Sequence, residues 1–317
     1  MMKTSRTSIL SVLSTLLLGA SAAFTASITA AQQLEKPDQV QRFPVALPAR
    51  GLAFDGATIW VGMDAAPWVT KLRASDGANL GDFPCGGAAL QLTFDGTYIW
   101  VTNYYDSQVT RLRASDGTMQ GTFPVGAFPW GILFDGASIW TANTQGNSVT
   151  KLRATDGAFE GNFSVGSRPW NLAFDGVNVW VTNTYDNTVT KLRASDGAVL
   201  GTFAVGNSPL GIAFDGTNLW IADLDSDSLT KLRASDGANL GTRPVGDGPW
   251  SVTFDGIHLW MTNAGDDTSM RLRGSNGTVQ HVYAVDRGPE AILFDGTSVW
   301  VSSYFGHSVD KISRMAP

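Results

Sequence analysis

The chain has 317 residues, with 22 basic and 28 acidic side chains and a formal net charge of −6. An acidic surface repels phosphate backbones, so we expect no nucleic-acid partner. The single cysteine, Cys85, excludes an intramolecular disulfide. It stands where later repeats carry valine, which favours a small buried apolar side chain over a reactive thiol.

The first 31 residues have the layout of a secretory signal peptide. Lys3 and Arg6 precede an apolar run over residues 9–18 and then small residues, with cleavage expected after Ala22 or Ala31. The run is too short for a permanent membrane span. We therefore expect a periplasmic or secreted protein of net charge about −8, because the removed segment carries two basic and no acidic residues. Residues 32–38 are a short polar tether.

A 40-residue repeat fills the rest of the chain. Phe-Asp-Gly occurs seven times, and a tryptophan follows each copy at a fixed spacing, without an insertion or deletion. A constant period in this range indicates a repeat architecture in which each copy is one supersecondary unit. The seven repeat tryptophans are Trp60, Trp100, Trp140, Trp180, Trp220, Trp260 and Trp300.

One repeat, residues 170–206, predicts four short strands. Apolar and β-branched runs at 171–174, 179–182, 188–192 and 200–205 alternate with Asp-Gly turns and a polar loop. No segment has the 3.6-residue period of a helix, which excludes a helical solenoid. The sequence therefore predicts an all-β fold: a seven-bladed β-propeller of four-stranded antiparallel blades, with residues 39–317 as a single domain.

The two ends of the chain are expected to share the last blade. Residues 42–45 align with the fourth strand at 122–125, whereas residues 290–312 supply only three strands. Adding the N-terminal strand to the last blade removes the remaining free sheet edge.

The repeated residues are expected to be structural. Each repeat tryptophan lies in an interior strand, where it buries a large apolar area against the next blade. The Asp-Gly pairs predict hairpin turns. We expect arginines such as Arg73 and Arg113 to form ion pairs with these acids rather than to leave a ring of calcium sites.

The variable residues gather on one face. The loops that connect successive blades, and those between the second and third strands, lie together on what we call the top face. We use the name collar for the seven residues, one per repeat, at the entrance of the innermost strands. We expect their side chains to ring the mouth of the central channel. The collar residues are Arg50, Leu90, Trp130, Trp170, Leu210, Trp250 and Glu290.

Aromatic side chains outside the repeat position concentrate on this face. Amphipathic rings around a solvated mouth suit a small molecule, a peptide or a glycan, although local packing is the alternative. The predicted ligand-binding residues are Arg50, Trp130, Trp170, Trp250, Glu290, Tyr104, Tyr185 and Tyr304.

Two further patterns suggest a catalytic pair and a calcium site, and each has a structural alternative. Glu290 and His307 are the top-face candidates for acid–base chemistry, with an Arg50–Glu290 ion pair at the seam of the ring as the favoured alternative. Residues 223–227 resemble the start of a calcium loop, but Ser228 and Ala234 stand where that loop requires glycine and glutamate.

The blade pattern, shown by residues 126–143 and 166–183, resembles YVTN/NHL-type propellers over residues 39–312. Among them it is most similar to the streptogramin B (virginiamycin B) lyase-like group. That resemblance implies a magnesium-dependent lyase with glutamate and histidine on the top face, and here only Glu290 and His307 could supply them.

Our first expectation is a monomeric binding or scaffold protein that requires no cofactor. The second is a magnesium-dependent C–O lyase that opens a macrocyclic depsipeptide. A cell-surface assembly module that uses the bottom face or the rim is the third.

Overall fold

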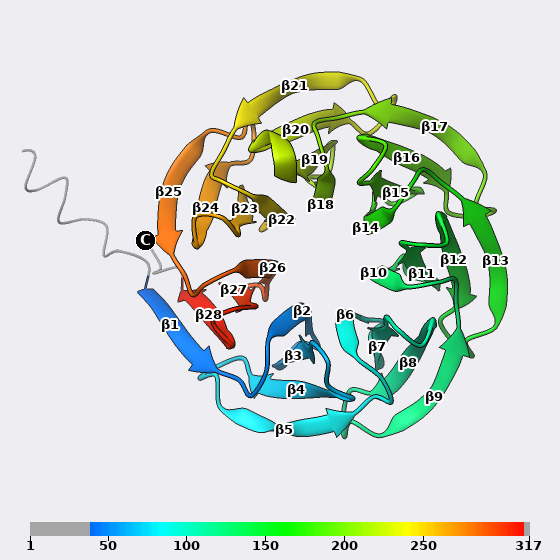
Figure 1. Ribbon diagram of the computed structural model, residues 1–317, viewed down its shortest axis with the longest axis vertical. Coiled ribbons are helices and arrows are strands. Elements are labelled where there is room, and N and C mark those ends of the chain that lie inside the picture. The colour runs from blue at the N-terminus through cyan, green and yellow to red at the C-terminus, as the bar shows by residue number, and fades with distance from the viewer. Residues whose placement is uncertain (1–38, 314–317) are drawn as a thin grey trace, which may run out of the picture. The chain divides into compact units, whose positions relative to one another are not determined.

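The computed structural model describes residues 39–313, and these form seven four-stranded antiparallel sheets arranged around a central axis (Figure 1). The predicted signal peptide and tether lie outside the described residues. Residues 40–313 are one compact unit. No helix in this range is long and apolar enough to cross a membrane.

Each sheet is one blade, numbered from the N-terminus with its innermost strand first. Blade 1 holds β2 (Ala49–Phe54), β3 (Thr58–Met63), β4 (Trp68–Arg73) and β5 (Asn79–Pro84). Blade 2 holds β6 (Ala89–Phe94), β7 (Tyr98–Asn103), β8 (Gln108–Arg113) and β9 (Met119–Pro124). Blade 3 holds β10 (Pro129–Phe134), β11 (Ser138–Asn143), β12 (Ser148–Arg153) and β13 (Phe159–Ser164).

The later blades repeat this order. Blade 4 holds β14 (Pro169–Phe174), β15 (Asn178–Asn183), β16 (Thr188–Arg193) and β17 (Val199–Ala204). Blade 5 holds β18 (Pro209–Phe214), β19 (Asn218–Asp223), β20 (Ser228–Arg233) and β21 (Asn239–Pro244), with the short 3-10 helix η1 (Leu224–Ser226) after β19. Blade 6 holds β22 (Pro249–Phe254), β23 (His258–Asn263), β24 (Thr268–Arg273) and β25 (Val279–Ala284).

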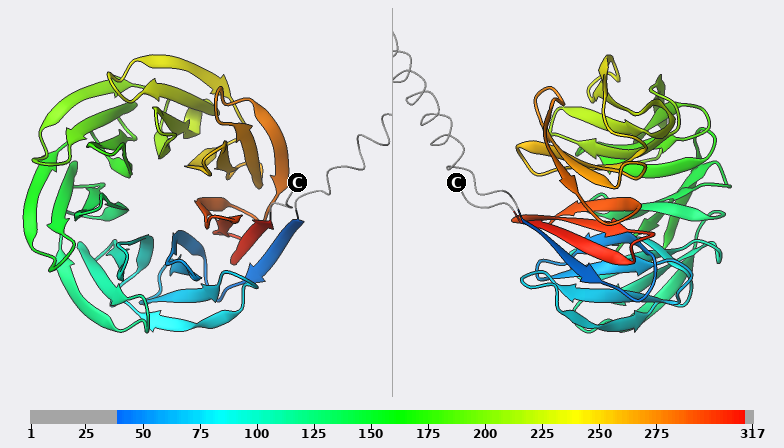
Figure 2. Two further views of the ribbon diagram at one scale, coloured as in Figure 1. Left: turned by 180° about the vertical axis from the view of Figure 1, so that it is seen from behind. Right: turned by 60° about the vertical axis from the view of Figure 1, so that its left-hand side comes forward.

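Blade 7 combines both ends of the described chain. Its strand order is β1 (Gln39–Pro44), β28 (Ser308–Ser313), β27 (Ser298–Ser303) and β26 (Pro289–Phe294), and β1 lies beside β28 in Figure 2. Arg42 donates to both oxygens of Asp310, at 2.8 and 3.1 Å. The predicted seven-bladed fold and its closure by the N-terminal strand are confirmed.

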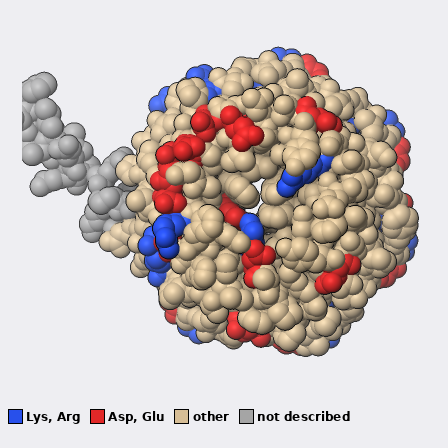
Figure 3. Space-filling model, viewed as in Figure 1, with Lys and Arg blue, Asp and Glu red and all other residues tan. Residues whose placement is uncertain are grey.

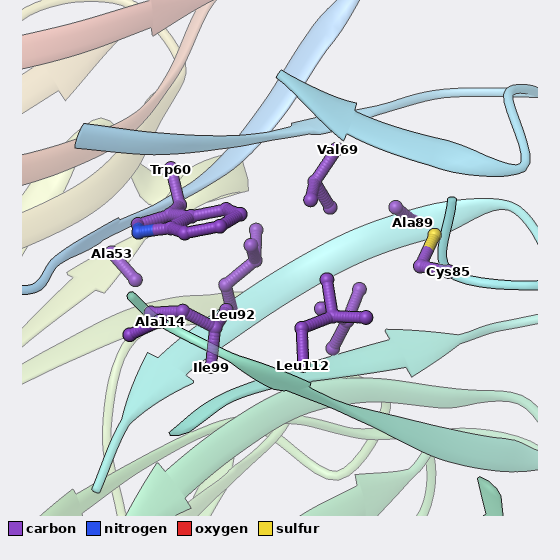
Figure 4. Close-up of a cluster of buried hydrophobic side chains, with 10 residues drawn as sticks. Ala53, Trp60, Val69, Cys85, Ala89, Leu92, Ile99, Leu112 and Ala114 are labelled. Atoms are coloured by element: carbon purple, nitrogen blue, oxygen red, sulfur yellow. The ribbon is translucent and has the colours of Figure 1, made fainter. Parts of the chain in front are cut away.

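Each repeat tryptophan packs between its own blade and the next. Figure 4 shows Trp60 beside Ala53 of blade 1 and above Leu92, Ile99 and Ala114 of blade 2. The repeat tryptophans are 0–1% exposed. Every one also donates its indole N–H to the aspartate of its own Phe-Asp-Gly, as Trp60 does to Asp55 at 2.8 Å. The Asp-Gly pair is therefore a turn, as predicted, and also a partner for the tryptophan.

The turn glycine is required by the backbone. Gly56 has a φ of 97°, a region open to glycine at little cost, and the turn closes through the amide of Asp55 and the carbonyl of Thr58. The predicted arginine ion pairs of the other bottom turns are confirmed in blades 1 to 5, whereas Arg273 of blade 6 has Asn276 at the place of the aspartate. Arg73 lies 2.9 Å from Asp76, and blades 2 to 5 repeat this pair.

The predicted strand limits needed small corrections. In blade 4 the innermost strand begins at Pro169, two residues before the predicted start, because Pro169 still pairs with Asn183.

Cys85 is fully buried, and its thiol donates to the carbonyl of Gly87. Burial raises the pKa of this thiol to about 11, which fits the packing role and not a reactive thiol.

Candidate functional site on the top face

The collar residues lie in β-bulges at the entrance of the innermost strands. The register between the innermost strand and its neighbour slips between Pro129 and Ile132 in blade 3, and most other blades slip at the same place. A bulge re-aims the side chain that it contains. A hydroxyl side chain on the second strand of the preceding blade holds the collar backbone. Thr262 on β23 of blade 6, for example, donates to the carbonyl of Glu290 in blade 7 at 2.8 Å.

Four aromatic collar and loop residues meet over the channel. The rings of Trp130 and Trp170 stack with centroids 4.1 Å apart, and Trp250 lies edge-on to Trp170 at 6.0 Å. Tyr104 packs edge-on against Trp130 at 5.7 Å. Trp130 and Trp170 are only 7% and 8% exposed.

This packing corrects the expectation of a solvated aromatic ring around an open mouth. Trp130 and Trp170 form a buried cluster with Leu90 and Leu210, against which Tyr104 and Trp250 are partly buried. The physical reason is that the innermost strands lie close together around the central axis, which brings indoles from different blades within stacking distance. A cavity of about 20 Å³ adjoins the cluster and is lined by the three tryptophans and by polar side chains such as Gln91 and Asn171. That volume is enough for one water molecule.

Arg50 is the centre of the polar half of the mouth. Its guanidinium lies 2.6 Å from Oε1 of Glu290 and 2.9 Å from Oδ2 of Asp64. The ring of Tyr304 lies 4.0 Å from the guanidinium carbon, and that of Trp130 lies 5.3 Å away. Figure 3 shows basic and acidic side chains side by side at the small central opening. The predicted ion pair between Arg50 and Glu290 is thus present at the seam between blades 1 and 7.

The carboxyl of Glu290 is buried, and only one of its oxygens is paired. Oε2 has no hydrogen-bond partner, and neither has Nε of Arg50. Burial raises the pKa of Glu290 to about 7 against the opposing charge of Arg50, and nearby Asp64 adds to the rise. Burial likewise raises the pKa of Tyr304, with a contribution from its hydrogen bond to Asp64.

The remaining predicted residues lie elsewhere. Tyr185 is exposed and hydrogen-bonds to Arg168, whose guanidinium lies 4.7 Å from the tyrosine ring. His307 is exposed in the β27–β28 turn, where its carbonyl accepts the amide of Val45. Val45 follows the outermost strand of blade 7, whereas Glu290 is on the innermost strand. The hydrogen-bond partner of Glu290 is Arg50, and no hydrogen bond or ion pair joins Glu290 to His307 among residues 39–313.

Asp64 belongs to the site, although the sequence did not predict it as a site residue. It occupies the loop position held by Tyr104 in blade 2 and Tyr304 in blade 7. An acid at that position in the blade that carries Arg50 was the available signal. The Asp223 loop gives no shared cation site either: Asp223 is buried and accepts from Thr230, while Asp225 accepts from Ser208. Among residues 39–313, no three His, Cys, Asp or Glu side chains are grouped as metal ligands.

Comparison with known proteins extends only to the fold. No protein-family model matches the sequence, and no curated protein matches it. A structure of streptogramin B lyase superposes with a TM-score of 0.74 and 20% identity, covering 87% of this chain and 97% of that one. Virginiamycin B lyase from Staphylococcus aureus gives 0.76 and 20%, covering 87% and 99%. U3-55K gives 0.76 and 13%, covering 88% and 100%.

The resemblance to the streptogramin B lyase-like propellers is therefore confirmed in three dimensions. At 20% identity it shows a shared seven-bladed architecture and leaves the activity open. U3-55K gives as high a TM-score, so the same ring also occurs in a protein whose name does not indicate a lyase.

Proposed function

We propose that this propeller is an exported binding protein that holds a small molecule, peptide or glycan on its top face, at the Arg50–Glu290 mouth. The observation that carries the proposal is the unpaired Oε2 of Glu290. A buried acceptor without a donor costs about 1–3 kcal/mol, and a ligand that supplies the donor offsets this cost.

The neighbours of Glu290 define the ligand. Tyr304, whose ring lies 4.0 Å from the guanidinium carbon of Arg50, and Trp250, the collar residue of blade 6, are both partly buried. These rings favour a ligand with an apolar or sugar face. A hydroxyl, amide or ammonium group on that ligand would donate to Oε2. Because this oxygen is covered, binding includes a change of rotamer, and Tyr304 over the guanidinium is the side chain best placed to make it.

A lyase is the second candidate, favoured by the structural neighbours and by the raised pKa of Glu290, which suits a general acid or base near neutral pH. The residues present do not fit magnesium. The guanidinium of Arg50 occupies the space between the carboxylates of Glu290 and Asp64 that a cation would need. His307 is exposed in the β27–β28 turn and forms no hydrogen bond or ion pair with either carboxylate among residues 39–313. We therefore favour binding over lyase chemistry and infer that no metal cofactor is required.

The test uses the chain without residues 1–31 and three probes: chitotetraose, the peptide Trp-Ala-Trp and virginiamycin B. Calorimetric titration is expected to detect at least one of them. Tyr304→Ala should weaken that probe by about tenfold, because truncated aromatic anchors typically lose 1–3 kcal/mol. Glu290→Gln should weaken it as well, since an amide presents a poorer acceptor.

The matched control is Phe159→Ala, which removes an exposed ring from the outer strand of blade 3 and should change nothing. If no probe binds, or if Phe159→Ala weakens binding as much as Tyr304→Ala, the top-face proposal is wrong. Ring opening of virginiamycin B by the wild type with magnesium, lost in Glu290→Gln, would establish the lyase instead.

A further inference from the structure

Blade 5 lacks an aromatic residue that every other blade has in its outermost strand. In the other six blades a Phe or Tyr packs on a repeat tryptophan at centroid distances of 5.3–5.7 Å, as Phe203 does on Trp180 at 5.5 Å. In blade 5 the equivalent residue is Arg243. Trp220 therefore has no aromatic partner among residues 39–313.

The missing ring leaves a pocket at the junction of blades 5 and 6. Its volume is about 280 Å³, and Trp220, Lys231 and Arg243 line it together with the bottom turn of blade 6 at Ser275 and Asn276. In blade 4 the phenyl ring of Phe203 fills this place so closely that a Cβ at Gly237 would overlap it. An apolar cavity of about 150 Å³ can bind benzene, so this pocket has room for an aromatic ring with a short substituent.

The charges at the pocket are basic. The ammonium of Lys231 lies 4.5 Å from the centre of the Trp220 ring and donates to the carbonyl of Ser275 at 2.9 Å. Lys231 is half-buried, whereas Lys71, Lys151, Lys191 and Lys311 at the same position are buried. Arg243 is exposed and has no acidic partner among the residues that the structure describes.

The bottom turn beside the pocket has also lost its acid. Blades 1 to 5 carry an aspartate that pairs with arginine in this turn, but blade 6 has Asn276. Two departures from the repeat, Arg243 and Asn276, thus coincide at one pocket: the first opens it and adds a cation, and the second removes a carboxylate.

We propose that this pocket binds a small aromatic carboxylate. The ring of the ligand takes the place of the missing phenyl group against Trp220, and its carboxylate pairs with Arg243 and Lys231. The site is separate from the top-face mouth, so the two proposals stand or fall independently.

The probe is 4-fluorobenzoate, followed by fluorine NMR on the chain without residues 1–31, with 4-fluorobenzamide as the neutral analogue. We expect the acid to bind at least tenfold more tightly than the amide. Arg243→Ala, which keeps the space and removes the charge, should weaken the acid about tenfold. Asn276→Asp, which restores the acid of the other turns, should also weaken it.

Arg243→Phe is the decisive variant, because it restores the side chain that most blades carry and is expected to fold. It should abolish binding and raise Tm by filling the pocket. Tyr304→Ala on the top face should leave binding unchanged. The proposal is overturned if 4-fluorobenzoate does not bind at millimolar concentration, if the amide binds equally well, if Arg243→Phe still binds it, or if Tyr304→Ala abolishes binding.

Discussion

The residue at the end of the second strand differs in blade 5 from that in its neighbours. Asp223 stands where Asn103, Asn143, Asn183 and Asn263 occur in other blades. It is fully buried, and Thr230 donates to its Oδ2 at 2.6 Å. Its Oδ1 has no partner, which is also true of Oδ1 in three of the asparagines, so the distinctive feature of Asp223 is its charge.

That charge makes the stability of the propeller depend on pH. Burial raises the pKa of the Asp223 carboxyl from 3.8 to about 7. Between these values the folded state holds a proton that the unfolded state has released, so the free energy of unfolding falls as pH rises. The penalty is absent below about pH 4 and complete above about pH 7, with an upper size of about 4 kcal/mol from a shift of about three pKa units. Glu290 contributes with the same sign.

Asp223→Asn is therefore expected to stabilise the protein at pH 8 by up to about 4 kcal/mol and to change little at pH 4. Urea denaturation at the two pH values measures this. The reciprocal control is Asn183→Asp in blade 4, which should destabilise the protein at pH 8 and not at pH 4. Equal stabilisation by Asp223→Asn at both pH values would show that shape and hydrogen bonding, not the charge, decide this position.

At the scale of the strand, a cation in six of the blades donates to the next blade. Lys191 on β16 lies 4.7 Å from the ring centre of Trp180, and its ammonium donates to the carbonyls of Ala234 and Ser235 in blade 5, at 2.8 and 3.3 Å. Equivalent contacts to a neighbouring blade start from Lys71, Arg111, Lys151, Lys231 and Lys311. Each tryptophan is thus held by apolar packing, an aspartate and a cation.

Lys191→Met tests the cation, because methionine keeps much of the apolar stem and removes the charge. The carbonyl of Ala234 then loses a buried charged donor, so we expect the free energy of unfolding to fall by about 1.5–3 kcal/mol. Lys191→Arg is the matched control: arginine fills this position in blades 2 and 6, and most of the stability should remain. Arg and Met variants of equal stability would show that the side chain acts through packing alone.

The repeat made the fold predictable, whereas the site depended on departures from the repeat. A fixed period with Phe-Asp-Gly and tryptophan determines blade number, strand order and closure, since each blade packs on its neighbours in the same way. The collar was placed correctly on one ring, but stacking of Trp130 on Trp170 depends on bulge geometry and on the width of the axis. The sequence did not predict a role for Arg243, because the effect of this residue is that Trp220 lacks an aromatic contact among residues 39–313, and a lacking contact leaves no motif in the sequence.

For the whole ring, closure depends on the blade made from both ends of the described chain. Strand β1 covers β28, which would otherwise be a free edge beside β27. Phe43 packs on Trp300 at 5.7 Å, and Arg42 neutralises Asp310, whose side chain is 0% exposed. Asp286 extends the same cluster, because its amide donates to Asp310 and its carboxylate lies 3.4 Å from Arg42.

Deleting residues 32–46 from the chain that begins at residue 32 should therefore expose the edge of β28, leave a buried carboxylate without its cation and uncover Trp300. Exposed edges pair with other chains, so we expect a lower Tm and self-association, measured by thermal melting and light scattering. Deleting only residues 32–37 removes none of these contacts and should match the parent. Arg42→Ala isolates the ion pair from the strand and should fall between the two, because it keeps the backbone ladder and Phe43. If both truncations melt alike, β1 contributes little to closure, and the ring must be held by the six blades built from consecutive strands.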